Sequence, residues 1–135
     1  GKRILLVEDN EINMEIAQFY LEDGGAAVDI AWNGAQAVNR FAASKEGYYD
    51  MILMDVQMPV MNGYEATKAI RRSTHKLAKT IPIVAMTANA FSEDIQHSLA
   101  AGMDAHISKP VEMKVLKKTI RNIKFGEGGY RNAGH

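Results

Sequence analysis

Short apolar runs alternate along the chain with longer segments whose apolar residues recur at helical spacing. The runs cover residues 3–7, 27–32, 51–55, 82–87 and 105–108. Apolar runs this short, without polar alternation, are typical of parallel strands that are buried on both faces. A segment with helical spacing follows each run, at about 10–23, 34–42, 64–72, 91–102 and 111–124. The pattern therefore predicts five strands and five helices in alternation.

The helical spacing also predicts which side chains face the sheet. The expected inward residues are Ile16, Ala17, Tyr20, Leu21, Ala37, Val38, Phe41, Ala42, Ala66, Ala69, Ile70, Phe91, Ile95, Leu99, Val111, Val115, Ile120 and Ile123. Ile12 and Phe19 lie at the edge of the inward-facing side of the first expected helix. They could either pack in the core or be exposed. The outer side of the last helix carries Lys114, Lys117, Lys118, Arg121 and Lys124, which we interpret as a solvated face.

Strands that alternate with helices indicate an α/β fold, in which a parallel sheet lies between two layers of helices. Right-handed crossovers leave few topologies for five strands. The common one is the flavodoxin-like (βα)5 three-layer sandwich with strand order 2-1-3-4-5. In this order the first and third strands are neighbours. The carboxyl ends of such strands form the edge where open α/β sheets bind ligands.

Composition narrows the classes of function. The 135 residues suit one domain, with 16 acidic and 16 basic residues and no cysteine. Balanced charge gives no reason to expect nucleic acid binding or membrane contact by this domain, and the missing thiols exclude disulfides and thiolate metal sites. We expect one domain over residues 1–125. The Gly-rich residues 126–135 are typical of a flexible linker or added tail, so the domain is expected to come from a longer protein.

Three carboxylates stand at the ends of the two strands that the topology makes neighbours. Glu8 and Asp9 follow the first strand, and Asp55 closes the third. A single aspartate at a strand end more often opens a turn, but three carboxylates at one edge repel one another strongly. A hard divalent cation would bridge them. A ligand set made only of oxygens points to Mg²⁺.

The ends of the fourth and fifth strands carry groups that suit a phosphoryl group. Thr87 offers a hydroxyl, and Lys109 offers a compact positive charge for a non-bridging oxygen. A carboxylate can itself be the nucleophile and form an acyl phosphate. Asp55 is the candidate because its strand is central, whereas Glu8 and Asp9 suit the role of metal ligands.

Four segments together resemble the response-regulator receiver domain of two-component signalling. They are Val7-Glu8-Asp9-Asn10, Met54-Asp55-Val56-Gln57-Met58-Pro59, Met86-Thr87-Ala88 and Ser108-Lys109-Pro110. The resemblance covers about residues 2–124. Within that family, the segments 8–13, 63–67 and 102–110 are similar to receivers of hybrid sensor histidine kinases and phosphorelays.

The resemblance implies a role for each matching position. Asp55 would accept a phosphoryl group from a phosphohistidine on a histidine kinase or a histidine phosphotransfer domain. Asp9 would ligate Mg²⁺ (or Mn²⁺), with Glu8 acting directly or through water and the backbone carbonyl of Gln57 adding a ligand. Thr87 would move toward the phosphoryl group as a switch residue, and Lys109 would pair with it.

The resemblance also implies partners and a location. Ile12, Asn13 and Pro110 would flank the surface on which histidine domains dock, and phosphorylation can lead such domains to self-associate. The domain would be cytoplasmic, within a parent chain that the inner or plasma membrane can anchor. His106 stands where switching regulators usually carry Tyr or Phe. It is either a histidine packed at the edge of the sheet or a residue that rotates with Thr87.

Such a domain catalyses only its own phosphorylation and dephosphorylation and turns over no external metabolite. One alternative is a stand-alone single-domain response regulator. A second is an Mg-dependent phosphohydrolase with an aspartyl nucleophile, which would commonly need a second acid at position 57, where this chain has Gln57. Nucleotide and flavin modules need Gly-rich or hydroxyl-rich phosphate loops. This chain has Glu8 and Asp9 after its first strand instead.

Overall fold

The computed structural model describes residues 2–56, 61–87, 96, 99–108 and 112–122. The elements follow one another in the expected alternation. They are β1 (Arg3–Val7), α1 (Glu11–Asp23), β2 (Ala27–Ala31), α2 (Gly34–Ala43), β3 (Met51–Asp55), α3 (Gly63–Arg72), β4 (Ile83–Thr87), β5 (Ala105–Ser108) and α5 (Met113–Asn122). Trp32 and Pro82, which we expected in strands, lie just outside them. Of the fourth expected helix, residues 96 and 99–102 are described; residues 96 and 99–101 are helical and Gly102 lies in a turn.

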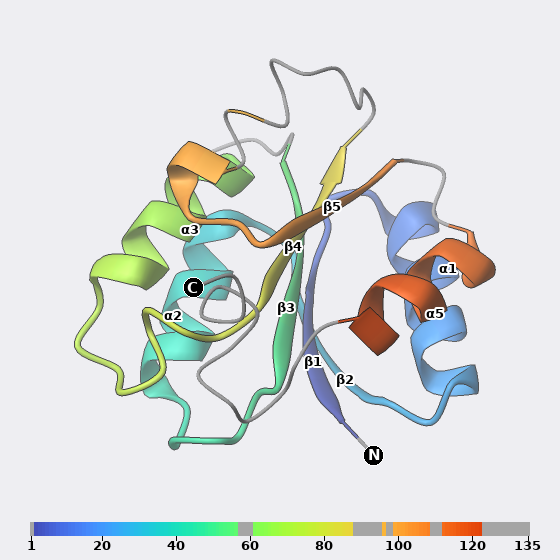
Figure 1. The fold of residues 1–135 in the computed structure, drawn as a ribbon, viewed down its shortest axis with the longest axis horizontal. Coiled ribbons are helices and arrows are strands. Elements are labelled where there is room, and N and C mark those ends of the chain that lie inside the picture. Colours follow the sequence, from blue (N-terminus) through green and yellow to red (C-terminus); the bar gives the residue numbers. More distant parts are fainter. Residues whose placement is uncertain (1, 57–60, 88–95, 97–98, 109–111, 123–135) are drawn as a thin grey trace.

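The strands form one parallel sheet in the order β2-β1-β3-β4-β5, which confirms the predicted topology. The helices lie on both sides of this sheet: α1 and α5 cover one face, and α2 and α3 cover the other (Figure 1). The register pairs Val7 of β1 with Met54 of β3, so the two strands end side by side. The carboxyl edge of the sheet is therefore built as the topology required.

Alternate residues of the central strands fill two separate cores. Leu5 and Val7 pack with α2 and α3, while Ile4 and Leu6 pack with α1 and α5. This division follows from the period of two along a strand. Because β1, β3 and β4 are covered on both faces, nearly all of their residues are buried. The absence of polar alternation in these runs has this cause.

The buried side of α1 matches the expected one except at Ile16. Ala17 and Leu21 are buried together with Met14, and Tyr20 packs against the same core, whereas Ile16, which we expected to face the sheet, is 41% exposed. Ile12 and Phe19, for which both outcomes were open, are also exposed. Apolar residues occupy two stripes of this helix, and spacing alone does not tell which stripe meets the sheet.

Three further inward assignments were wrong. Ala42 of α2 is exposed, as are Leu99 and Val115. On α5 the buried contact is made by Leu116 instead, one residue further along the helix. A shift of one residue along a helix rotates the assignment by about 100°, which accounts for the exchange of Val115 for Leu116. Phe91, Ile95, Val111 and Ile123 lie outside the described residues.

The ends of the helices near the carboxyl edge are defined by asparagine caps. The Asn10 side chain accepts a hydrogen bond from the Asn13 N–H, and Asn62 forms a capping box with Glu65. Each cap satisfies a backbone donor that the helix leaves open. In the described part of the chain, every helix is too short or too polar to cross a membrane.

Candidate functional site

The carboxyl edge of the sheet brings the three predicted carboxylates together. One carboxylate oxygen from each of Glu8, Asp9 and Asp55 lies within 4.8 Å of the others. Glu8 and Asp55 are each 1% exposed, and Asp9 is open to solvent. Two opposite ligands of one octahedral Mg²⁺ lie about 4.2 Å apart, twice the usual bond length. The group therefore has nearly the dimensions of a single cation site, with one open side.

Two amide donors, one from the N-cap residue of α1 and one from its first turn, hold the side chain of Glu8. The backbone N–H of Asn10 and the side-chain amide of Asn13 donate to Glu8 Oε1, at 3.3 Å and 3.4 Å. The Glu8 N–H itself donates to the Ala31 carbonyl of β2 at 3.2 Å. Glu8 is thus fixed by two elements in an orientation toward Asp55.

The backbone around Asp55 is fixed by β4 and by the start of α3. The Val56 N–H donates to the Met86 carbonyl at 3.0 Å, and the Gly63 N–H donates to the Val56 carbonyl at 3.1 Å. A Cβ at position 63 would lie 2.4 Å from the Asp55 carbonyl oxygen and 2.8 Å from the Val56 Cα. Only glycine permits this approach. Sequence reasoning assigned Gly63 no role, although its place shortly after the Asp55 strand was a usable signal.

The two remaining described candidates stand on the neighbouring strands. Thr87 closes β4 and follows Met86, which is the register partner of Asp55. Its side chain is buried at the same edge. His106 lies in β5 opposite Ala85 and is half-buried. The sheet thus places Thr87 close to the end of the Asp55 strand and His106 two positions before the end of β5.

The partner-surface candidates are described only in part. Ile12 is 67% exposed on α1. Asn13 is exposed beside it and contacts Glu8 through its side-chain amide. Gln57, Lys109 and Pro110 lie outside the described residues, so their assigned roles stay predictions.

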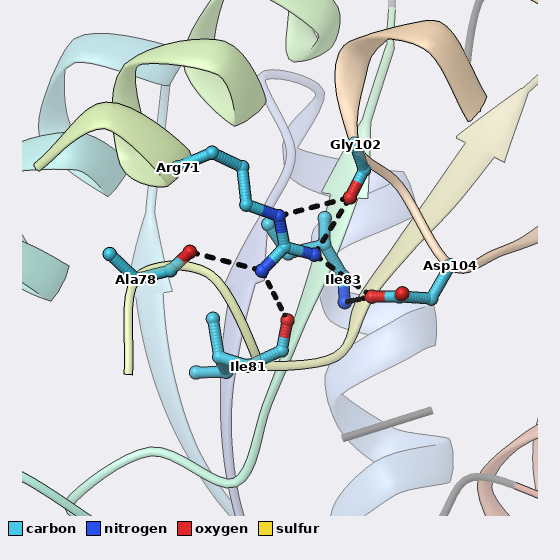
Figure 2. A network of polar contacts seen from close by, with 6 residues as sticks. All are labelled: Arg71, Ala78, Ile81, Ile83, Gly102 and Asp104. Atoms are coloured by element: carbon cyan, nitrogen blue, oxygen red, sulfur yellow. Dashed lines mark hydrogen bonds and ion pairs between the residues drawn. The ribbon is translucent and has the colours of Figure 1, made fainter. Parts of the chain in front are cut away.

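A network at the opposite edge of the sheet was missed by the sequence analysis. Arg71 of α3 donates to the carbonyls of Ala78, Ile81 and Gly102 at 2.7 to 3.1 Å (Figure 2). It also pairs with Asp104 at 2.9 Å, and Asp104 accepts the Ile83 N–H. The Asp104 side chain is 1% exposed and that of Arg71 is 11% exposed. The network ties α3 to the segments that lead into β4 and β5.

A second charged cluster lies at the same amino edge. Asp29 of β2 accepts from Arg3 at 3.1 Å and from the Tyr49 hydroxyl at 2.9 Å. Burial raises the pKa of Tyr49 to about 12, and the hydrogen bond to Asp29 adds to this shift. The neutral phenol is therefore the form that the folded chain stabilises.

Comparison with known proteins yields one family. The sequence model of the response regulator receiver domain matches residues 4–121. The chain is 40% identical to probable histidine kinase 1 of Oryza sativa subsp. indica, over 88% of the chain and 15% of that protein. It is 37% identical to hybrid signal transduction histidine kinase L of Dictyostelium discoideum, over 98% of the chain and 8% of that protein. The chain thus spans a small part of the length of these relatives.

Solved structures agree with this result. The receiver domain of sensor histidine kinase PA1611 from Pseudomonas aeruginosa, with a magnesium ion coordinated in its active site cleft, has a TM-score of 0.80 and 37% identity. The likeness covers 90% of this chain and 95% of that one. The receiver domain of Ssk1, crystallised with the histidine phosphotransfer protein Ypd1 of Saccharomyces cerevisiae, has a TM-score of 0.77 and 33% identity, over 90% and 87% of the two chains.

Proposed function

The chain belongs to the response regulator receiver domain family, and we propose that its Asp55 accepts a phosphoryl group from a phosphohistidine. The observation that carries the proposal is the meeting of Glu8, Asp9 and Asp55 at the carboxyl edge of the sheet. Of the three, Asp55 lies on the central strand, between β1 and β4. In this proposal, ligand oxygens and the hydroxyl of Thr87 would surround the phosphoryl group on its carboxylate.

The reaction is a transfer between two nucleophiles. The bond between phosphorus and the histidine ring nitrogen breaks, and the ring nitrogen keeps the electron pair. A carboxylate oxygen of Asp55 forms the new bond to phosphorus, which gives an acyl phosphate. Catalysis of such transfers consists mainly of positioning and of charge stabilisation. The backbone hydrogen bonds of Val56, the residue after Asp55, to β4 and to the start of α3 would supply the positioning.

The proposed metal is Mg²⁺, held by Glu8, Asp9 and Asp55 and by the backbone carbonyl of Gln57. Support comes from the donor set, which is entirely oxygen, and from the spacing of the three carboxylates. Mn²⁺ favours similar ligands and is an expected substitute. When bound, the cation neutralises the carboxylates and the oxygens of the phosphoryl group. Glu8 would be a pre-oriented ligand, because two amide donors already fix its carboxylate.

Three further residues complete the proposed site. Thr87 would donate its hydroxyl to a phosphoryl oxygen, and Lys109 would pair with the same group. His106 lies on the strand next to that of Thr87, which is consistent with a residue that responds to movement of Thr87. The alternative is that His106 only packs at the sheet edge. Its half-buried side chain fits either a switch residue or a packed one.

The proposed donor docks beside α1. Ile12 and Asn13 are exposed on the first turn of this helix, and Asn13 contacts Glu8. Together with Pro110, they would form an apolar and polar rim around the site. We propose a histidine kinase or a histidine phosphotransfer domain as partner. A hybrid histidine kinase is the proposed parent protein, with residues 1–125 as the domain and 126–135 as a linker.

The test is intact mass after incubation with Mg²⁺ and a small acyl-phosphate donor. The unaltered chain should gain about 80 Da, the mass of one phosphoryl group, because Asp55 is the nucleophile. Asp55→Asn should gain nothing, and a chelator should abolish the gain. A matched control is Asp50→Asn, which alters an aspartate before the same strand and should still be phosphorylated. An adduct of equal yield on Asp55→Asn would refute the assignment.

A further inference from the structure

The outer surface formed by α1 and α5 has a negative half and a positive half. α1 carries Glu11, Glu15, Glu22 and Asp23 and no basic residue, and α5 carries Lys114, Lys117, Lys118 and Arg121 and no acidic residue. We propose that this α1–α5 face binds a second copy of the same chain, so that α1 of each copy lies against α5 of the other.

The charges of this face are available to a partner. All the charged residues named above are exposed. The ion pairs found in the described part of the chain are Arg3–Asp29, Arg71–Asp104 and Lys76–Glu46, and they involve none of these residues. The two helices therefore do not neutralise each other within one copy. The whole chain has a formal net charge of +0, so long-range repulsion does not oppose the approach of two copies.

Apolar side chains accompany the charges. Seven large hydrophobic residues of the described chain are exposed, and four of them lie on these two helices: Ile12, Ile16, Phe19 and Val115. Three of the four follow one another along α1 at helical spacing, beside the acidic residues. An apolar strip flanked by charges is the usual composition of an interface with a buried centre and a polar rim. The aliphatic stems of the α5 lysines can cover the strip of the other copy.

The arrangement of the helices permits a closed dimer. α1 and α5 lie side by side on one face of the sheet (Figure 1), and a groove of about 530 Å³ between them is lined by Tyr20, Leu21, Leu116 and Ile120. Both helices follow strands of a parallel sheet, so they run in the same direction. A two-fold axis parallel to them places each α1 over the partner's α5. Opposite charges then face each other twice, and the groove leaves room for side chains of the other copy.

Self-association through this face has a consequence for signalling. Ile12 belongs both to the α1–α5 face and to the proposed docking surface for the phosphohistidine donor. A dimer would therefore exclude that donor while leaving the site open to a small acyl phosphate. This consequence rests on the proposed function, whereas the dimer itself does not.

The test is sedimentation equilibrium of the 135-residue chain, with charge reversals on either helix. The unaltered chain should dimerise as its concentration rises, and dimerisation should weaken between about 0.05 M and 0.5 M salt because the contacts are electrostatic. Glu15→Lys and Lys118→Glu should each weaken dimerisation at least about tenfold, since like charges then meet across the interface. A mixture of the two variants should dimerise again, because one of each restores both opposed pairs.

Lys68→Glu is the matched control, since it makes the same change of charge on α3, at the other face of the sheet, and should leave dimerisation unchanged. A chain that stays monomeric at low salt would overturn the proposal, as would equal weakening by Lys68→Glu. The chain could stay monomeric while Glu15→Lys slows its phosphorylation by a histidine phosphotransfer domain. That result would assign the face to this donor instead. Phosphorylation by the small acyl phosphate in every variant would show that Asp55 chemistry is intact in either case.

Discussion

The two edges of the sheet differ in what surrounds their buried carboxylates. At the carboxyl edge, three carboxylates from β1 and β3 gather within 4.8 Å of one another. At the amino edge, the buried carboxylate of Asp104 is paired with Arg71 and with the Ile83 N–H. Both edges bury acidic side chains; at the amino edge Asp104 pairs with Arg71, and at the carboxyl edge three carboxylates lie close together. The carboxyl edge gathers carboxylates that could hold a cation, whereas the amino edge pairs its buried carboxylate with an arginine.

This difference explains why one fold can hold an electrostatically unfavourable site. Like charges at about 4 Å repel by several kcal/mol where the surroundings are only partly aqueous. At the other end of the sheet, the contacts of Arg71 with three backbone carbonyls and a carboxylate contribute stability that offsets this repulsion. Proteins commonly hold reactive or strained groups in place through the stability of the surrounding structure.

The largest effect is expected from breaking the amino-edge network. Arg71→Met would leave the Asp104 carboxylate buried without its cation and would free three carbonyls. Loss of one partner of a buried ion pair costs about 3 to 5 kcal/mol. Urea unfolding should show a loss of this size. Lys76→Met, which removes the exposed pair with Glu46, should change the free energy of unfolding by less than about 1 kcal/mol. Equal losses in the two variants would contradict the contrast between buried and exposed pairs.

The Asp29 cluster predicts a pH dependence at the same edge. The pKa of Tyr49 is raised to about 12 from 10.0 by burial and by the hydrogen bond to Asp29. The folded chain holds the phenol proton more tightly than the unfolded chain. The stabilisation is therefore complete below pH 10 and is lost as pH rises from about 10 to about 12, by on the order of 2 kcal/mol.

Tyr49→Phe isolates this contribution. The difference in unfolding free energy between the unaltered chain and Tyr49→Phe should shrink over that pH range. A difference that stays constant up to pH 12 would mean that the Tyr49 proton is not held by the fold.

At the carboxyl edge, Gly63→Ala tests how α3 positions Asp55. The new Cβ would lie 2.4 Å from the Asp55 carbonyl oxygen, so the backbone of α3 or of Asp55 must shift. We expect destabilisation of about 1 to 3 kcal/mol and a slower phosphorylation by the small acyl phosphate. Gly24→Ala is the control, because its Cβ would make ordinary contacts of 3.5 Å. An unchanged phosphorylation rate in Gly63→Ala would show that this approach does not position the nucleophile.

The sequence predicted the carboxyl edge better than the amino edge, and the reason is physical. Strand order follows from the alternation of strands and helices, and it makes Glu8 and Asp55 neighbours without any knowledge of side-chain packing. The pair of Arg71 and Asp104 joins residues 33 positions apart through the conformation of two loops. No local pattern encodes such a contact.

The misassigned helical residues show a second limit. Ile16 and Val115 are apolar and have helical spacing, yet adjacent stripes of the same helices are buried instead. Hydrophobic periodicity predicts that a helix packs, but it fixes the rotation of a helix with two apolar stripes only loosely. The rotation is decided by tertiary packing against the sheet. Its outcome on α1 leaves the apolar strip on which the proposed dimer depends.

The most direct measurement is the effect of Mg²⁺ on the unfolding free energy of the unaltered chain and of Asp55→Asn. Without Mg²⁺, Asp55→Asn should be more stable by about 1 to 4 kcal/mol, because one of three repelling charges is gone. Mg²⁺ at a hundred times the dissociation constant should stabilise the unaltered chain by about 2.7 kcal/mol. It should stabilise Asp55→Asn much less, because the variant lacks one ligand, so the stability advantage of Asp55→Asn should shrink. Equal stabilisation of both proteins by Mg²⁺ would contradict a metal site built on Asp55.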